Sequence, residues 1–371
     1  MISAQRLPVS LTPLDVALAA LLRGLEPSAV VELPVGEALG CISADLPPLK
    51  AHPPYDVATA DGWALRANDL VGASSFSPLP LTSAIWLEAG DRMPNGCDCV
   101  VEPDSVDQTG PIIQALVEAI PGQGVRRVGE DLAEGSVIGS GMRLRPLDLL
   151  VARAAGLETI RVRRPRLRIV NIPATSGEVI TAQLIHDCAR SAGGEVTFVE
   201  ATSRDPAAVA AAFEPAACDL LITIGGSGIG RTDATVMALA QRGEVIAHGI
   251  ALRPGHTSAL GRIGRTPVIA ISGSADHALG AWWTLALPTL DRLSGRQPRP
   301  ARGLPLARKI ASSVGIAEIT LLGRRDDSWV PLAVGDLPYG AMLAADAWLL
   351  IPGGSEGYAA GTPVAAYILR E

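Results

Sequence analysis

A chain of 371 residues is too long for one hydrophobic core, since single cores stop growing near about 250–300 residues, so we expect two to four domains. Apolar residues make up 48% of the chain and charged residues 19%, which indicates a globular protein and excludes a disordered one. The net charge of −7 argues against non-specific nucleic-acid binding, which needs Lys and Arg to neutralise a line of phosphates.

The cysteines show neither zinc spacing nor a regular disulfide framework, so we expect reduced thiols and a cytoplasmic location. They are Cys41, Cys97, Cys99, Cys188 and Cys218. The first residues lack an apolar signal core, and no run of about 18 uncharged apolar residues occurs. Secretion and membrane spanning are therefore not expected.

The first predicted element is a helix over residues 14–25, with Thr12-Pro13 as its cap and first-turn proline. A second helix is predicted from Pro146 to Gly156, and we expect it to pair with the first in an elongated segment. Together these stretches predict a helical linker domain over residues 1–44 plus 141–165.

Between them, short apolar runs such as 84–87 and 99–101 are broken by Gly, Pro, Asn and Asp. Such a pattern is typical of short strands joined by turns. We therefore expect a β-rich inserted domain over residues 45–140.

From Arg166 onward, short apolar runs alternate with helical patterns. The predicted strands are 167–172, 195–199, 220–224, 244–247 and 267–271, and the predicted helices are 179–191, 207–213, 233–241 and 277–293. This alternation indicates an α/β domain over residues 166–297 with a parallel sheet, in which ligands bind at the carboxyl ends of the strands.

The polar, proline-rich stretch from Ser294 to Pro300 predicts a linker. Residues 301–371 then form a small C-terminal β domain, with strands expected at 318–322, 348–351 and 364–369. The fold class is therefore multidomain α/β and elongated, with an α/β domain, a β-rich inserted domain, a helical segment and a small β domain.

A glycine-rich turn follows the predicted strand 220–224 and contains Gly225, Gly226, Ser227, Gly228 and Gly230. Glycines let backbone amides face an anion, and a helix start adds a favourable dipole of about 0.3–1 kcal/mol. The plainer alternative is a tight turn that Asp233 caps, but four glycines in six residues exceed what a turn needs.

The same stretch fits the P-loop pattern G-x-x-x-x-G-K-T if Arg231 replaces the lysine. A nucleoside triphosphatase is therefore a weaker alternative. The planar fork of arginine does not substitute for the compact charge that a P-loop lysine places on phosphates, which disfavours this interpretation.

Two further loops carry groups that bind anions. The first contains Arg253, Gly255 and His256, and the second contains Ser272, Gly273 and Ser274. A surface turn and a capped helix, respectively, are the simpler interpretations of these loops.

Acidic residues in the inserted domain are candidates for metal binding or for positioning a water. Asp61 lies in an Asp-Gly pair, which is most often only a turn. Glu130 and Asp131 follow the basic pair Arg126-Arg127, and such a charge cluster is usually a solvated loop.

In this order, the motifs resemble those of the molybdopterin molybdenumtransferases, also called the MoeA or gephyrin E-domain family. Residues 54–64 are similar to the family's P-x-x-D-x-S-A-M-D-G-Y-A, residues 94–101 to its P-x-G-x-D-x-V-V, and residues 126–131 to its arginine and Gly-Glu-Asp stretch. Arg164-Pro165-Arg166 opens the α/β domain as in the family, and the resemblance covers nearly the whole chain.

The resemblance implies an enzyme that takes adenylylated molybdopterin, releases AMP with Mg²⁺ present, and inserts molybdate. It implies a homodimer whose site is shared, with Asp61 approaching from the other subunit. The implied catalytic residues are Asp61, Glu130, Asp131 and Asp233, with Mg²⁺ on Asp61 and Asp233. The implied cofactor-binding residues are Gly225, Gly226, Ser227, Gly228, Gly230, Arg253, Gly255, His256, Ser272, Gly273 and Ser274.

The chain departs from the family pattern near this chemistry. Thr-Gly-Ala becomes residues 89–91, Ser-Thr-Gly-Asp-Glu is shortened within residues 173–178, a lysine falls on Val236, Lys-Pro-Gly-Lys-Pro becomes residues 253–257, and Pro-Gly-Asn-Pro becomes residues 272–275. Losing one preorganised electrostatic group raises the activation free energy of the reaction by about 2.7–4 kcal/mol. Ligand binding depends less on the lost side chains, because the backbone amides of the glycine-rich turn remain, so we expect binding to survive better than turnover. The alternative is therefore a paralogue that binds molybdopterin or a nucleotide for delivery or regulation.

Overall fold

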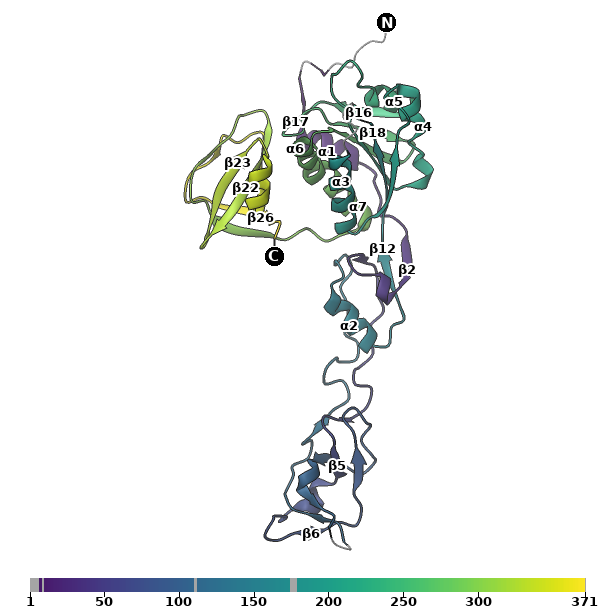
Figure 1. Cartoon of the computed structure of the whole chain (residues 1–371), viewed down its shortest axis with the longest axis vertical. Coiled ribbons are helices and arrows are strands. Elements are labelled where there is room, and N and C mark those ends of the chain that lie inside the picture. Colours follow the sequence, from purple (N-terminus) through teal and green to yellow (C-terminus); the bar gives the residue numbers. More distant parts are fainter. Residues whose placement is uncertain (1–6, 9, 110–111, 174–178, 371) are drawn as a thin grey trace.

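The computed structural model describes residues 7–8, 10–109, 112–173 and 179–370. Figure 1 shows an elongated chain, with an α/β region at one end, a C-terminal β region beside it, and a long arm that carries α2 and ends at β5 and β6. The expected multidomain α/β fold is confirmed. Within the described ranges, no helix has the length and apolar character needed to cross a bilayer.

The α/β region is built on one six-stranded sheet in the order β14-β13-β15-β19-β18-β16. Its strands are β13 (Arg166–Asn171), β14 (Glu195–Glu200), β15 (Leu220–Ile224), β16 (Glu244–His248), β18 (Ala259–Ile263) and β19 (Thr266–Ile271). The first four strands in that order are parallel, whereas β18 is antiparallel to β19 and β16. The prediction of a parallel sheet is wrong at this edge, because only residues 264–265 join β18 to β19 and a parallel crossover needs about a dozen residues.

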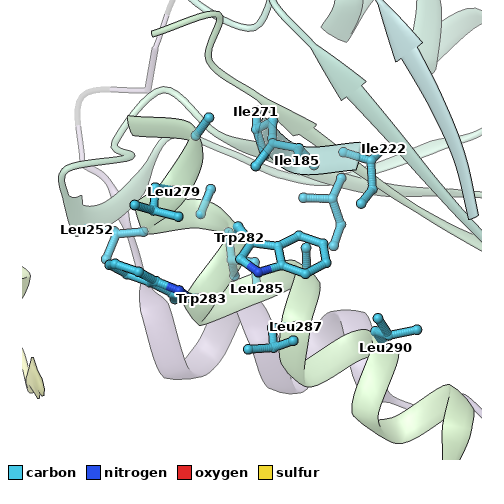
Figure 2. Packing of buried hydrophobic residues seen from close by; sticks show 14 of the residues in the cluster. Ile185, Ile222, Leu252, Ile271, Leu279, Trp282, Trp283, Leu285, Leu287 and Leu290 are labelled. Carbon is cyan, nitrogen blue, oxygen red and sulfur yellow. The ribbon is translucent and has the colours of Figure 1, made fainter. Parts of the chain in front are cut away.

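Helices cover both faces of this sheet, as expected from the central strands β15 and β19, which are buried along nearly their whole length. One buried cluster joins α3 (Ile180–Ser191) to a continuous helical run of α6 (Ala275–Ala281), the π-helical turn η5 (Trp282–Ala286) and α7 (Leu287–Ser294). Figure 2 shows Trp282 of this run near Ile185 and Ile222. A second cluster, on the other face, joins α4 (Pro206–Ala211) and α5 (Thr235–Arg242) to the sheet.

The N-terminal helix α1 (Leu14–Leu22) packs on the α/β core, where Leu14 and Leu21 join the same buried cluster as α3 and α7. The second helix, α2 (Pro146–Ala154), buries Leu149 against a different cluster in the arm. The prediction that the two helices pair is therefore wrong. Thr12-Pro13 does not cap α1 through a side chain, because these residues form the short strand β1, which pairs with β17 (Ile250–Arg253).

The arm begins with a small sheet that the chain crosses on its way out and back. Its order is β2-β12-β3, with β2 (Val30–Pro34), β12 (Thr159–Arg163) and β3 (Ile42–Ser43), and the turn η1 (Val35–Glu37) packs near α2. Because β12 is antiparallel to β2 and β3, the outgoing and returning segments are held together where the arm leaves the α/β region.

The far end of the arm consists of short strands and turns. One sheet has β7 (Ile85–Leu87), β5 (Gly62–Leu65) and β8 (Cys99–Val101), so the strands expected near 84–87 and 99–101 are confirmed. The other strands are β4 (Val57–Ala58), β6 (Leu79–Pro80), β9 (Val106–Asp107), β10 (Gln114–Ala115) and β11 (Val125–Arg126), with 3-10 turns η2 (Ala67–Leu70) and η3 (Pro103–Ser105). Leu65, Leu70 and Cys99 are buried in its core.

The C-terminal region is a mostly antiparallel sheet around Trp329, which is fully buried. Its elements are β20 (Ala301–Pro305), β21 (Ile310–Ala311), β22 (Ala317–Arg325), β23 (Ser328–Val334), α8 (Tyr339–Ala344), β24 (Ala347–Ile351), β25 (Gly357–Tyr358) and β26 (Pro363–Ile368). The three strands expected here are confirmed by β22, β24 and β26. Since β17 also pairs with β22, the sheet continues into the α/β region.

All five cysteines are unpaired, as expected. Burial raises the pKa of each thiol, to about 11 for Cys99, Cys188 and Cys218. These side chains are therefore poor nucleophiles near neutral pH.

Candidate functional site

The glycine-rich turn borders a cavity of about 290 Å³ at the carboxyl ends of β15 and β19. Gly225 and Gly226 have φ values of +93° and +66°, a region that favours glycine. A Cβ atom on Gly226 would lie 2.5 Å from Oγ1 of Thr235, which in turn donates a hydrogen bond to the carbonyl of Gly225 at 3.0 Å. The turn therefore needs glycine, and it lies where open α/β sheets bind ligands.

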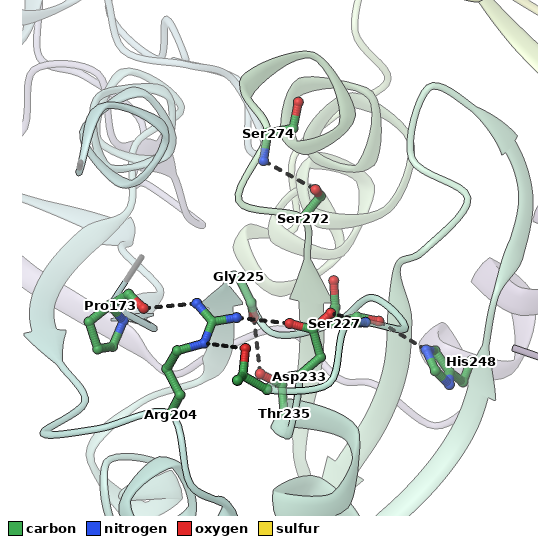
Figure 3. A network of polar contacts seen from close by, with 11 residues as sticks. Pro173, Arg204, Gly225, Ser227, Asp233, Thr235, His248, Ser272 and Ser274 are labelled. Atoms are coloured by element: carbon green, nitrogen blue, oxygen red, sulfur yellow. Dashed lines mark hydrogen bonds and ion pairs between the residues drawn. The ribbon is translucent and has the colours of Figure 1, made fainter. Parts of the chain in front are cut away.

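Arg204, in the loop between β14 and α4, is the cation of this cavity. Its guanidinium lies 2.9 Å from Oδ1 of Asp233 and donates to the carbonyl of Pro173 at 2.9 Å and to Oγ1 of Thr232 at 3.1 Å (Figure 3). The side chains of Arg204 and Asp233 are only 28% and 15% exposed, so this ion pair is screened little by water.

The carboxylate of Asp233 lies within the glycine turn itself. Its Oδ2 accepts a hydrogen bond from the amide of Gly230 at 2.9 Å, and Cβ atoms at Gly228 or Gly230 would come within 2.7 or 3.0 Å of it. The amide of Gly225 is also used, since it donates to the carbonyl of Ile271. The Asp233 carboxylate therefore lies beside the Arg204 guanidinium, in the position that an anionic ligand would use.

The opposite wall is the short turn after β19. The amide of Ser274 donates to Oγ of Ser272 at 3.1 Å, and the Thr181 hydroxyl of α3 donates to the carbonyl of Gly273 at 2.7 Å. Thr257 and His277 also line the cavity. The resulting surface is rich in hydroxyls and amides, which bind oxyanions without carrying charge.

Ser227 gives a more buried part of the site. Its carbonyl lies 2.9 Å from Nε2 of His248 in β16. Its hydroxyl is buried and has no hydrogen-bond partner within the part of the chain that the structure describes. A buried hydroxyl without a partner is costly, and Ser227 is one of the residues that line the cavity. A small movement of this side chain would let its hydroxyl bond to a ligand.

Two family descriptions match consecutive parts of the chain. "MoeA N-terminal region (domain I and II)" matches residues 12–156, and "Probable molybdopterin binding domain" matches residues 170–292, which include the glycine turn and Arg204. The chain belongs to the MoeA family.

Relatives of this MoeA chain match over most of their length. "Molybdopterin molybdenumtransferase" of Synechococcus elongatus is 26% identical and is covered over 87% of its length by 84% of this chain. "Molybdopterin molybdenumtransferase 2" of Mycobacterium tuberculosis is 27% identical, with 77% of this chain and 81% of the relative covered. A solved MoeA molybdopterin biosynthesis protein of Pyrococcus horikoshii is 26% identical, with a TM-score of 0.73 over 98% of this chain and 100% of that one.

Most of the site residues expected from sequence surround one cavity: Gly225, Gly226, Ser227, Gly228, Asp233 and residues 272–274. Gly230 does not line the cavity, but its amide donates a hydrogen bond to Asp233, which does. Arg231, which the P-loop alternative needs, is exposed and is not among the residues that line the cavity. The helix expected over residues 233–241 is α5, which begins at Thr235, two residues later than predicted. The expected motif at 174–178 lies outside the described residues.

Arg253 and His256 occupy a neighbouring position rather than the cavity wall. Arg253 forms an ion pair at 3.3 Å with Glu318, a carboxylate only 6% exposed that also accepts from the Ser312 hydroxyl at 2.6 Å. His256 packs edge-on against His277, with ring centroids 5.2 Å apart. Burial lowers the pKa of His256, and the positive charges of His277 and Arg253 lower it further. Gly255, with φ +125°, shapes the turn between them.

The other expected catalytic residues lie in the arm. Asp61 immediately precedes β5 and accepts a hydrogen bond from the amide of Ala89 at 2.8 Å. Glu130 accepts from the amide of Arg127 at 2.8 Å, and Asp131 pairs with Arg126 at 3.2 Å. Arg127 and Glu130 line a groove of about 620 Å³. Figure 1 places β5 at the end of the arm, far from α5, so one chain does not bring these acids to Asp233.

The described residues of a single chain do not form a magnesium site. In the described ranges, no three His, Cys, Asp or Glu side chains gather as a metal site would require. Both oxygens of Asp233 accept hydrogen bonds, from Arg204 and Gly230, so this carboxylate does not present a ready ligand pair. Within one chain, the described residues therefore do not fit the ion.

Sequence reasoning missed Arg204, Thr257 and His277. One signal for Arg204 was present, because it follows the predicted strand 195–199 and ligands gather at the carboxyl ends of parallel strands. The sequence alone does not show that β14 lies next to β13, close enough to bring this loop to the glycine turn.

Proposed function

We propose that this chain is a molybdopterin molybdenumtransferase, an enzyme of molybdenum cofactor biosynthesis that inserts molybdate into molybdopterin. The observation that supports this most directly is the cavity between the glycine turn and the 272–274 turn, with Arg204 at its corner. It lies in the part of the chain that matches the molybdopterin-binding family, and relatives with the transferase name align over most of both chains.

In the proposed complex, the pterin phosphate lies on the glycine turn. The Ser227 hydroxyl, the 272–274 turn and the amide of Gly230, once Asp233 releases it, supply donors, and Arg204 supplies charge. Because Asp233 already accepts from Arg204 and Gly230, ligand binding requires the carboxylate to turn away from the basic corner. Arg253, Gly255 and His256 are proposed to hold the second anion, molybdate, near the junction with the C-terminal sheet.

The finer parts of the proposal concern the arm. We propose that the substrate is adenylylated and that AMP is released with Mg²⁺ present. We also propose a homodimer in which Asp61, Glu130 and Asp131 of one subunit approach Asp233 of the other. Support comes from the geometry, since the arm holds Asp61 far from its own glycine turn. A cytoplasmic location is part of the same proposal.

We also propose the division into domains at 1–44 plus 141–165, 45–140, 166–297 and 301–371. The separate buried clusters of the arm, the α/β region and the C-terminal sheet support it. Two features depart from this division. α1 packs with the α/β core, and the same buried cluster includes Ile319, Leu321 and Trp348 of the C-terminal region.

The test of the function is a turnover assay with the purified full chain, adenylylated molybdopterin, molybdate and Mg²⁺. We expect AMP release and molybdenum on the product. A chain that binds the pterin tightly yet releases no AMP above background, while an active transferase does, would overturn the enzyme proposal in favour of a binding paralogue. A chain that binds no pterin phosphate would overturn both.

The shared site is tested by mixing two inactive variants, Asp61→Asn and Asp233→Asn. If each site takes one acid from each subunit, a mixed dimer carries one intact site of its two. A purified mixed dimer then regains about half of the wild-type activity, and a random mixture regains about a quarter. No regained activity in co-purified mixed dimers would contradict the shared site.

A further inference from the structure

A second cavity, of about 810 Å³, lies where the C-terminal sheet meets the α/β region. It is bounded by α3, the helical run from η5 to α7, the linker after α7, and strands β20, β24 and β26. Its volume falls in the range of about 300–1,000 Å³ that small-molecule pockets occupy. None of the residues assigned above to the transferase site lines it.

One wall of this cavity is a stack of aromatic rings that joins the two regions. Trp283 of η5 stacks on Trp348 of β24, with centroids 5.0 Å apart and planes 5° from parallel, and Trp348 stacks on Tyr367 of β26 at 4.7 Å. The two tryptophans are buried, whereas Tyr367 is only half-buried. The stack therefore offers ring surface to a planar group from its tyrosine end.

The other wall is basic. Of the described residues that line the cavity, four are arginines and one is an aspartate, Asp187, whose side chain is 78% exposed. Arg299 is neutralised by Asp291, with two contacts of 2.7 Å. Among the described residues, no carboxylate pairs with Arg143 or Arg302, and Arg143 donates instead to the carbonyl of Ser191. In a chain of net charge −7, this is a local excess of positive charge.

Among the four arginines, Arg296 gives the strongest evidence for an anion site. Its Nη1 atom is buried and has no hydrogen-bond partner among the residues that the structure describes. Burial lowers its pKa, and the charge of Arg299 lowers it further. A buried guanidinium nitrogen without an acceptor is costly, and an anion in the cavity would supply that acceptor.

We propose that this cavity binds a nucleoside monophosphate or another phosphorylated planar heterocycle of that size. The heterocycle packs on Tyr367 at the end of the aromatic stack, and the phosphate accepts hydrogen bonds from Arg296 and its neighbouring arginines. The proposal stands apart from the transferase site, because it involves none of the glycine-turn residues.

The experiment is isothermal titration of the full chain with AMP and GMP, with adenosine and inorganic phosphate as separate arms. We expect saturable nucleotide binding, and weaker binding by at least about tenfold for each half alone, since both walls contribute. Arg296→Gln and Tyr367→Leu should each weaken binding by about tenfold or more. Arg325→Ala, which removes an exposed arginine from outside the cavity, should leave it unchanged.

Arg204→Ala separates this site from the glycine turn. Retained nucleotide binding in Arg204→Ala supports the proposal, whereas loss there with full binding in Arg296→Gln and Tyr367→Leu places the nucleotide in the transferase site and overturns it. Absence of saturable binding to the wild-type chain also overturns it. Thermal melts of both cavity variants establish that they are folded, and a crystal soaked with AMP shows directly whether the phosphate meets Arg296.

Discussion

The guanidinium of Arg204 lies 2.9 Å from Oδ1 of Asp233 and connects the loop after β14 to the glycine turn after β15. The two residues hold each other in place at the corner of the cavity, and the carboxylate occupies the position next to the cation that an anionic ligand needs. Asp233 therefore holds Arg204 in position at the site, and its carboxylate also competes with an anionic ligand for the Arg204 guanidinium.

Arg204→Ala is expected to weaken binding of a pterin phosphate. A hydrogen bond to a charged group contributes about 1.5–3 kcal/mol, which corresponds to about a 10- to 150-fold rise in Kd. Titration calorimetry measures the change. Arg231→Ala is the matched control, because Arg231 lies on the same turn but is exposed and does not line the cavity. Equal affinities for the two variants would contradict a role for Arg204 in the site.

Gly226→Ala is expected to destabilise the turn for two reasons. The φ of +66° costs an alanine about 1–2 kcal/mol, and the new Cβ would meet the Thr235 hydroxyl at 2.5 Å. Gly264→Ala separates these effects, since Gly264 has φ +59° with no atom within 4 Å of the built Cβ. Chemical denaturation should show a larger loss for Gly226→Ala. A loss no larger than that of Gly264→Ala would mean that Thr235 moves aside freely.

His256 is expected to make stability depend on pH. Its folded pKa lies below the ordinary value of 6.5, mainly through burial and then through His277 and Arg253. As pH falls through 6.5, the unfolded chain takes up a proton before the folded chain does. This contribution to stability is therefore present above that pH and is lost below it.

His256→Gln should consequently flatten the change in melting temperature between about pH 7.5 and about pH 5.5. His186→Gln serves as the control, because the His186 ring of α3 lies 3.1 Å from the carboxylate of Asp187. If the wild-type chain and His256→Gln show the same pH slope, the expected effect of this contact is absent.

Trp348→Ala should loosen the C-terminal sheet from the α/β region. The ring is only 7% exposed and stacks between Trp283 and Tyr367, and removing a buried tryptophan costs about 3–5 kcal/mol. Limited proteolysis in the linker 295–300 should accelerate, with a lower denaturation midpoint. Trp86→Ala is the comparison, because Trp86 is 44% exposed on β7 and should cost much less. Similar losses for both would argue against the stack as the main connection.

Much of the fold followed from local patterns. The strand from Leu220 to Ile224 is an apolar run that ends at a glycine turn, and both features are visible within ten residues of sequence. The helices α3, α5 and α7 likewise carry apolar residues at helical spacing. The sequence patterns did not predict β17, whose partners lie far away along the chain, with β1 on one side and β22 on the other.

The sequence by itself determined the order of elements, the family resemblance and the glycine turn, because each depends on residues close together along the chain. Only the tertiary structure decided that Arg204 meets Asp233 across 29 positions, that α1 joins the α/β core, and that Asp61 ends on an arm far from its own glycine turn. The physical reason is that periodicity reports which face of an element is apolar, whereas the choice of partner depends on how all the faces are buried at once.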